Sequence, residues 1–415
     1  MKKTLTTAIV IASLTLPLNA IEVYNKDDAK VDVYGSVRGL VGYGSYRQFS
    51  ENFDNKTFDV GNTIFALQGN SRIGVSANVG KVFGNVELGV KDTAISNTIA
   101  SGFRHLYAGY NFGEPYGTIL IGKTTSIAGT DFSSDIFFTD GGLVGFGNGS
   151  QGERRFQVQY KSNYGVSFAI MESSVTNNSI TNADETHNNV RLPVFALSYD
   201  FIGLDDNLIA KIGASYTQVN VRAKLGNNRT DSNTDNYPVT VNAYAINAAA
   251  TYKLLDKKLY LTAIASYSLD AHLYSDTMTP KFNAIHSVDD EYKRESEIRQ
   301  NKQNGIKLYS AALEAGYNIL DNLKAVVGGG YQYSIKESLI QDVDFSFIRN
   351  NIFQSYGIFS QVSYQINKLL ILTPSVGYYG ILKAAQNNGP AQIVAENREK
   401  YNAQLLAGVQ TRLNF

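Results

Sequence analysis

The chain has 415 residues, and its 37 basic and 37 acidic residues leave no net formal charge. Cysteine is absent, which excludes disulfide frameworks, thiolate zinc sites, iron–sulfur clusters and cysteine nucleophiles. A nucleic-acid-binding protein needs a clustered basic surface, and the balanced charge of this chain does not suggest one. A mean hydropathy of −0.18 excludes a bundle of membrane helices, but it is compatible with a membrane barrel, whose strands alternate apolar and polar residues.

Residues 1–20 have the pattern of a secretory signal peptide. Lys2 and Lys3 precede a short apolar run over 8–16, and Pro17 and Ala20 lie near the expected cleavage point. The alternatives are a membrane anchor or a core helix, but the run is too short to span a bilayer of about 30 Å. We therefore expect a mature chain beginning near Ile21 that leaves the cytoplasm through the inner membrane.

The mature chain alternates apolar and polar residues with a period of two. In the first predicted strand, Val37 and Val41 share one face, and Ser36 and Arg38 share the other. Such alternation indicates strands with one apolar and one wet face. The pattern recurs over 72–79, 86–91, 155–161, 244–252, 259–267, 309–317, 323–333 and 401–415.

Short and long connections alternate along the chain. Short ones lie near 80–85, 112–116, 162–165, 201–207, 254–258, 319–322 and 366–368. Long polar ones lie near 45–66, 93–102, 124–153, 173–191, 221–238, 272–305, 337–353 and 383–400. Seven short turns and eight long loops fit an all-β, closed antiparallel barrel of 16 strands with both termini on the short-turn side.

A soluble β-sandwich or a propeller is the competing interpretation of these strands. The strands are longer and more one-sided than those folds need, and no blade-length repeat is present. Closure follows from the membrane environment, because an open sheet edge would leave backbone groups unsatisfied in lipid. Pro374 contradicts the pattern locally, since proline cannot donate a ladder hydrogen bond.

The alternation also assigns charged side chains to the inner face. Arg38, Arg72 and Arg155 have the inward phase, as a water-filled lumen requires. Arg104 has the same phase as Leu106, whose apolar side chain is expected on the outer face of the barrel. Either a bulge shifts the phase of this strand, or its outer face packs against another subunit.

A catalytic role has little support in the sequence. Ser268, Asp270 and His272 share one strand face, but neighbours two residues apart lie about 6.6 Å apart, beyond hydrogen-bond reach. An outer-membrane hydrolase is therefore only a minor alternative, and we expect neither an enzyme nor a cofactor. No EF-hand spacing is present, and no metal site is predicted.

Several short motifs resemble the general trimeric porins of Gram-negative outer membranes. They are Val31–Gly35, Asn70–Gly74, Phe103–Gly109, Tyr116–Lys123 and the terminal Phe415. The resemblance implies a homotrimer of 16-stranded barrels embedded in outer-membrane lipid, each with short periplasmic turns, long external loops and a third loop folded into the pore. It also implies that Phe415 is an assembly signal for the barrel-insertion machinery.

The resemblance further implies a pore constriction with a basic wall and an acidic loop. The wall residues would be Arg38, Arg72, Arg104 and Arg155, and the loop over 124–153 would contribute Asp131, Asp135 and Asp140. The loop lacks the family's Pro-Glu-Phe-Gly-Gly motif, and Ser36 stands where a Lys is common. The phenylalanines of the loop are expected to pin it to the wall.

Residues 21–415 are thus expected to form a single barrel that serves as a porin, a water-filled channel for passive diffusion of ions and small hydrophilic solutes. The main alternative is a structural or adhesin-type outer-membrane barrel with a plugged lumen. The near-balanced charge does not indicate whether the channel would prefer cations or anions.

Overall fold

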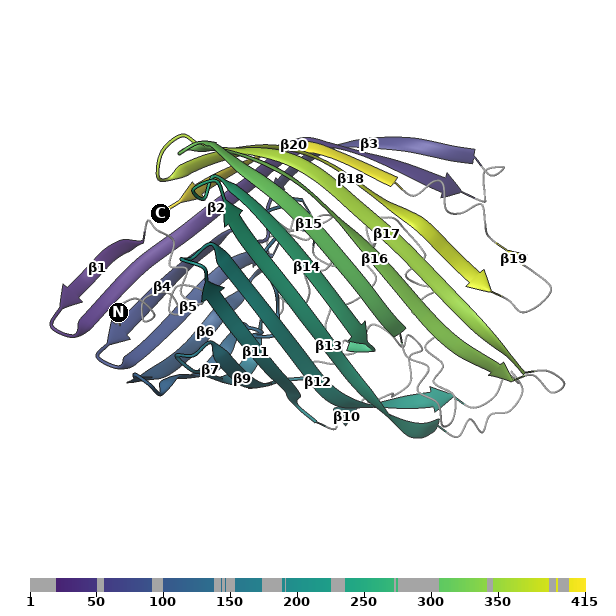
Figure 1. The fold of residues 1–415 in the computed structure, drawn as a ribbon, viewed down its shortest axis with the longest axis horizontal. Coiled ribbons are helices and arrows are strands. Elements are labelled where there is room, and N and C mark those ends of the chain that lie inside the picture. Colours follow the sequence, from purple (N-terminus) through teal and green to yellow (C-terminus); the bar gives the residue numbers. More distant parts are fainter. Residues whose placement is uncertain are drawn as a thin grey trace.

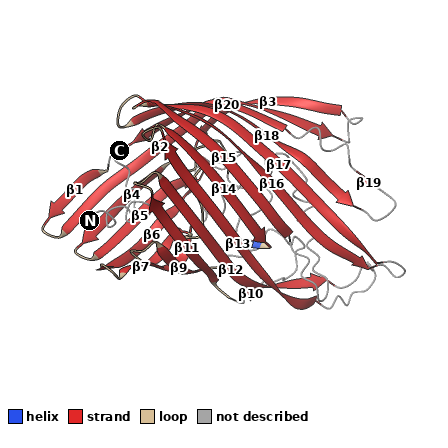
Figure 2. Ribbon diagram, in the orientation of Figure 1, coloured by secondary structure: helices blue, strands red, loops and turns tan. Residues whose placement is uncertain are grey.

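The computed structural model describes residues 20–50, 56–91, 100–137, 143, 146, 154–173, 189–190, 192–224, 236–271, 274, 306–341, 346–387, 393–394 and 403–415. Nearly all of them belong to strands or to short turns, as Figure 2 shows. Among these residues, no helix is long and apolar enough to cross a membrane. The predicted signal peptide, except Ala20, lies outside the described residues.

The first half of the chain forms ten strands, some of them very short. They are β1 (Ile21–Lys26), β2 (Ala29–Ser50), β3 (Lys56–Leu67), β4 (Arg72–Val79), β5 (Val82–Lys91), β6 (Ala100–Gly113), β7 (Gly117–Thr125), β8 (Arg154–Lys161), β9 (Val166–Met171) and β10 (Asn189–Val190).

The second half forms ten more strands, several of them long. They are β11 (Val194–Gly203), β12 (Leu208–Lys224), β13 (Asn236–Leu254), β14 (Leu259–Leu269), β15 (Ile306–Leu320), β16 (Leu323–Gln341), β17 (Ser346–Gln365), β18 (Leu370–Asn387), β19 (Ile393–Val394) and β20 (Ala403–Asn414).

The strands close into an antiparallel barrel of 16 positions, which confirms the predicted all-β architecture (Figure 1). β2 forms the closing seam: it pairs with β20 along one edge and with both β3 and β4 along the other. β3 and β4 therefore occupy one position, interrupted at 68–71. The short strands β1, β10 and β19 pair with β2, β12 and β18 and add no position of their own.

All seven predicted short connections join neighbouring strands at the end of the barrel where the C-terminus lies (Figure 1). An additional turn at Asp27 and Asp28, which was not predicted, joins β1 to β2. Asp27 adopts a left-handed backbone with φ of 53°, a conformation that aspartate tolerates in turns. At the other end, the strands extend further than expected. β2 continues to Ser50, and β12 continues to Lys224.

Burial confirms the predicted phase of the strand faces. On β2, Val37 and Val41 are exposed on the outside of the barrel, whereas Asp32 and Ser36 are buried on its inner side. The same alternation holds on β4, β5, β8 and β20. The barrel thus presents an apolar surface outward and polar side chains inward.

Pro374 is accommodated by a local gap in the sheet. Its strand, β18, pairs with β20 without interruption, and Pro374 lies opposite Val409. Towards β17, the pairing is interrupted between Ser375 and Leu372 without a change of register, so the missing proline N–H falls in a gap of the ladder. A hydrogen bond of 3.1 Å between the hydroxyls of Ser363 and Thr373 bridges the two strands there.

Candidate functional site

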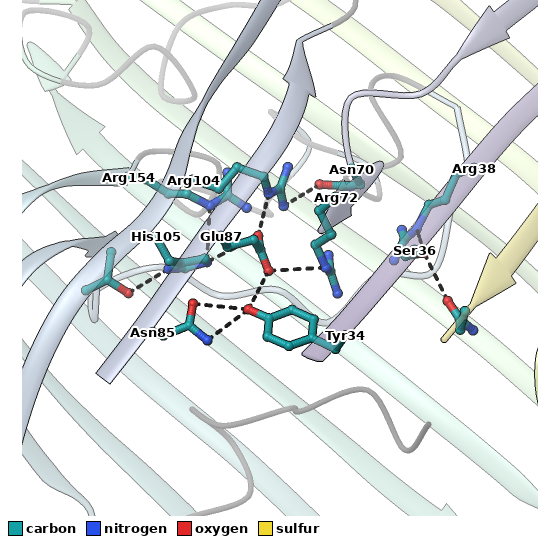
Figure 3. Close-up of polar contacts among 12 residues, drawn as sticks. Tyr34, Ser36, Arg38, Asn70, Arg72, Asn85, Glu87, Arg104, His105 and Arg154 are labelled. Atoms are coloured by element: carbon teal, nitrogen blue, oxygen red, sulfur yellow. Dashed lines mark hydrogen bonds and ion pairs between the residues drawn. The ribbon is translucent and has the colours of Figure 1, made fainter. Parts of the chain in front are cut away.

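Glu87 of β5 lies at the centre of a charged cluster on the inner wall (Figure 3). Its Oε1 accepts a hydrogen bond of 2.7 Å from Nε of Arg104, and its Oε2 lies 3.4 Å from Nε of Arg72. The Tyr34 hydroxyl donates to Oε2 at 3.0 Å. Because two guanidinium groups flank one carboxylate, the cluster has a positive excess.

A β-bulge positions Arg104. Glu87 pairs with His105 and Leu88 pairs with Phe103, so Arg104 is the extra residue of β6. Phe103 and Leu106 are both exposed on the outside, although an uninterrupted strand would place them on opposite faces. The bulge interpretation of Arg104 is therefore confirmed, and its inward side chain needs no neighbouring subunit to explain it.

The interruption between β3 and β4 supplies further partners for Arg104. Its Nη1 donates to the carbonyl oxygen of Gly69 at 2.8 Å, and its Nη2 donates to Oδ1 of Asn70 at 2.9 Å. These bonds, with that to Glu87, hold the guanidinium plane in one orientation.

His105 and Arg154 extend the cluster towards β7 and β8. The His105 ring lies 3.1 Å from the Thr124 hydroxyl through Nδ1 and 3.9 Å from Glu87 through Nε2. Arg154 donates to Nε2 of His105 at 3.4 Å. Sequence reasoning missed Arg154 and His105 as site residues. The alternation of Val86, Glu87 and Leu88 is that of an inward Glu87, but the sequence does not show the cross-strand register that brings the arginines to it.

The other two predicted wall arginines occupy different places. Arg38 donates to the Ser36 hydroxyl at 3.2 Å and lies near enough to Arg72 to repel it. Arg155 is buried, and its guanidinium donates to the carbonyl oxygens of Glu172 and Tyr274. The structure therefore brings Arg38, Arg72 and Arg104 together and places Arg155 apart from them.

The described part of the segment that follows β7 is bonded to several strands of the inner wall. Glu314 of β15 accepts hydrogen bonds from the backbone N–H and the hydroxyl of Ser134, both at 2.8 Å. Gln361 of β17 donates to the Ser134 carbonyl oxygen at 2.7 Å. The Gln68 side chain donates to the carbonyl oxygen of Ile136 at 2.8 Å. Glu314 is thus a principal anchor of this segment, and the sequence did not mark it as a site residue.

The three predicted loop aspartates differ in their surroundings. Asp135 is 2% exposed and accepts hydrogen bonds from the Tyr379 hydroxyl at 2.8 Å and from the Phe137 N–H at 3.1 Å. Burial raises the pKa of Asp135 to about 6, although these donors oppose the shift. Asp131 is exposed and attracts Arg154 electrostatically. Asp140 lies outside the described residues.

An apolar cluster attaches the same segment to the wall. Phe137, Leu143 and Phe146 are almost fully buried, and they pack with residues of β17, β18 and β20. The wall residues include Phe359, Tyr379 and Leu406. The expectation that phenylalanines pin the loop is confirmed for Phe137 and Phe146.

At the seam of the barrel, Phe415 continues the ladder between β2 and β20. Gly35 donates its N–H to the Phe415 carbonyl oxygen at 2.7 Å, and Phe415 donates to that of Gly35 at 3.1 Å. A Cβ at position 35 would collide with the Phe415 ring.

Within the described residues, no group of His, Asp and Glu side chains has the arrangement of a metal site. Ser268 and Asp270 are buried, and His272 lies outside those residues. The clustered arginines, with one carboxylate between them, can attract and orient ions at the inner wall.

Comparison with known proteins shows the fold. No protein-family model matches the chain, and no curated protein matches its sequence. The outer membrane channel DcaP of Acinetobacter baumannii is similar in structure, with a TM-score of 0.61 and 16% identity over 94% of this chain and 99% of that one. The anion-selective porin from Comamonas acidovorans has a TM-score of 0.52 and 14% identity over 93% of this chain and 100% of that one. OmpT of Vibrio cholerae has a TM-score of 0.51 and 16% identity over 95% of this chain and 100% of that one. The chain therefore has the barrel fold of outer-membrane channels.

Proposed function

We propose that the protein is a non-enzymatic outer-membrane channel through which ions and small hydrophilic solutes diffuse passively. The observation that carries the proposal is a closed barrel of 16 strands with an apolar outer face and a charged inner face. A barrel of this strand number encloses more space than wall side chains fill, so it leaves an aqueous passage. The fold shared with outer-membrane channels supports the same function.

Tyrosines on the outer face support placement in a membrane. Tyr309 and Tyr317 of β15 lie eight residues apart with apolar residues between them, and Tyr244 and Tyr252 of β13 have the same spacing. Eight residues extend about 27 Å, or about 19–22 Å along the normal at the usual tilt of a barrel strand. This height is close to the apolar band of outer-membrane barrels, about 25 Å, whose edges carry aromatic girdles.

We infer that the loop over 124–153 narrows the pore. Its described part bonds to Glu314, Gln361 and Tyr379, which belong to strands far along the sheet from β7 and β8. The proposed constriction keeps the basic wall of Arg38, Arg72, Arg104 and Arg155 and the acidic loop of Asp131, Asp135 and Asp140. Asp131 is its exposed carboxylate, and Asp135 serves mainly as an anchor.

The remaining assignments follow from sequence and fold. We propose that residues 1–20 are a cleaved signal peptide and that 21–415 form one barrel domain, with Phe415 read by the barrel-insertion machinery. The homotrimer proposal gains support from the fold shared with porins of solved structure.

A plugged barrel remains a second candidate because of one observation. The apolar cluster of Phe137, Leu143 and Phe146 fills space against β17, β18 and β20 that would otherwise hold water. Purified protein in planar lipid bilayers separates the two functions. The channel proposal expects discrete conductance steps in salt solution. A barrel that inserts without conductance would establish the plug and contradict the channel.

A further inference from the structure

Basic side chains form a second group on the inner wall, close to the short turns. This group, called here the basic belt, is spread around the barrel from β8 to β2, where Arg38 joins it to the arginines of the Glu87 cluster. It consists of Lys161, Lys211, Lys253, Lys324, Arg412 and Arg38.

Strand phase directs the belt residues inward. Lys211 precedes Ile212, which is exposed on the outside, and Arg412 precedes Leu413, which is also exposed. Lys253 is in phase with Thr251, whose hydroxyl lies 2.8 Å from that of the buried Thr262.

Register and ring contacts tie the belt together. Nζ of Lys324 lies 4.2 Å from the centre of the Tyr260 ring, on the inner side of β14. Arg412 and Arg38 face each other across the closing seam in register. Lys161 and Lys211 lie near enough for mutual repulsion.

The described carboxylates of the inner wall do not cancel this charge. Asp200 lies 3.7 Å from Lys211 and also attracts Lys161, and Glu314 attracts Lys324, so these two carboxylates face a belt of six bases. Two other carboxylates of the inner wall are paired with bases outside the belt. Asp32 lies 3.1 Å from Lys30, and Glu87 lies between Arg72 and Arg104.

We propose that the channel selects small anions, and that the basic belt at its short-turn mouth is a main source of this preference. The inference rests on the proposed channel function and names its solute class. Rings of Lys and Arg favour anions in pores because they lower the energy of a negative ion in the mouth and raise that of a cation. The belt and the arginines around Glu87 meet at Arg38, so together they give the inner wall a continuous basic surface beside the path of an anion.

The size of the effect follows from Coulomb's law. A base about 10 Å from the path of a monovalent ion changes the population of that ion about twofold in water. Screening weakens the effect in concentrated salt, since the Debye length falls from about 30 Å at 0.01 M to about 3 Å at 1 M. Selectivity should therefore be strong in dilute salt and should fade in concentrated salt.

The test is the reversal potential of the full-length protein in planar bilayers under a potassium chloride gradient at low salt. We expect chloride to be at least about twice as permeant as potassium, since one base already changes ion populations by that factor. The triple variant Lys161→Gln, Lys253→Gln, Lys324→Gln should lower this ratio at least about twofold. The same three positions changed to arginine should keep the ratio, and Lys257→Gln, at an exposed turn position, should lower it less than the triple variant does.

The outcomes separate the two proposals. Absence of any conductance would contradict the channel function itself. A conducting wild-type channel that prefers potassium would overturn the anion preference and leave the channel function standing. A chloride preference that survives the triple glutamine variant, in protein that still conducts, would remove the belt as its source.

Discussion

Gly330 of β16 lies directly beneath the side chain of Phe146, and a Cβ at position 330 would collide with the Cβ of Phe146. Gly357, its register partner on β17, leaves room for Tyr379 and for the edge of the same phenylalanine ring. The two glycines therefore form a depression in the inner wall that receives the loop.

Filling this depression should release the loop. Gly330→Val is expected to displace Phe146 and to cost about 1–3 kcal/mol of stability, as overpacking of a tight site does. Single-channel conductance should rise, because the loop would occupy less fixed space in the pore. Gly39→Ala is the control, since nothing lies within 4 Å of a Cβ there. Equal conductance of Gly330→Val and wild type would show that this contact does not set the pore width.

Glu314 should hold the loop by charge. It accepts bonds from Ser133, Ser134 and the Tyr260 hydroxyl, and bonds to a charged group contribute about 1.5–3 kcal/mol each. Glu314→Gln keeps the shape but removes the charge, so thermal stability in detergent should fall and current fluctuations in bilayers should increase. Glu22→Gln, at a half-exposed side chain of β1, should change neither. If the current through Glu314→Gln fluctuates no more than that of wild type, Glu314 does not anchor the loop.

Much of the fold was predictable because it follows from local periodicity. A period of two gave the inner and outer faces of β2, β8 and β20, and turn residues gave the short connections. The hairpin of β1 was missed because all six residues of Ile21–Lys26 are exposed, so no buried face imposes alternation.

The site was less predictable because its contacts depend on register and on loop path. Arg104 faces inward because it is the extra residue of a β-bulge. The period-two pattern was compatible with a bulge in this strand, but it could not show at which residue the bulge lies. The bond between Asp135 and Tyr379 joins residues 244 positions apart, and no local pattern encodes it. The resemblance to porins implied that Asp135 belongs to the acidic face of the loop, whereas the structure buries its side chain.

Asp135 should make stability depend on pH. Its pKa is raised in the folded state, from 3.8 to about 6, so burial favours the neutral carboxyl. The resulting stabilisation is complete below the unfolded pKa and is lost as the pH rises through about 6, which amounts to about 3 kcal/mol by linkage. Thermal unfolding in detergent should therefore show a higher melting temperature at pH 4.5 than at pH 7.5.

Two variants isolate this carboxyl from the others. Asp135→Asn should flatten the pH dependence between pH 4 and 7, because the amide does not ionise. Asp131→Asn, at an exposed position of the same segment, should keep the loss of stability near pH 6. If Asp135→Asn unfolds with the same pH profile as the parent protein, the buried carboxyl is not its origin.

Charge at the Glu87 cluster should set the sign of ion preference locally. Glu87→Gln removes the carboxylate between Arg72 and Arg104, so the reversal potential should move towards anions. Arg72→Glu should move it towards cations, because a second carboxylate then lies beside Glu87. Each shift should shrink at 1 M salt, where the Debye length is about 3 Å. Shifts of the same sign for both variants would exclude a direct electrostatic role for the cluster.

Closure of the barrel should depend on Phe415 and Gly35 together. The two reciprocal backbone bonds extend the pairing of β2 and β20 to the last residue, and the ring occupies the space left by the missing Cβ of Gly35. Beyond this point, β1 continues along the same edge of β2, with Ile21 opposite Val33. Gly35→Val should therefore displace the ring at the junction of β20 and β1, and it should lower the folded, heat-modifiable fraction on gels.

Packing and recognition of Phe415 can be separated with matched variants. Deleting Phe415 should lower assembly in cells and leave export to the periplasm intact, whether the ring acts by packing or by recognition. Gly35→Val leaves the terminal residue in place, so a loss of folded barrel on refolding in detergent, without insertion machinery, indicates packing. Gly102→Ala, where nothing lies within 4 Å of the added Cβ, controls for the loss of a strand glycine. If Gly35→Val refolds as completely as wild type while the deletion fails only in cells, Phe415 acts through recognition alone.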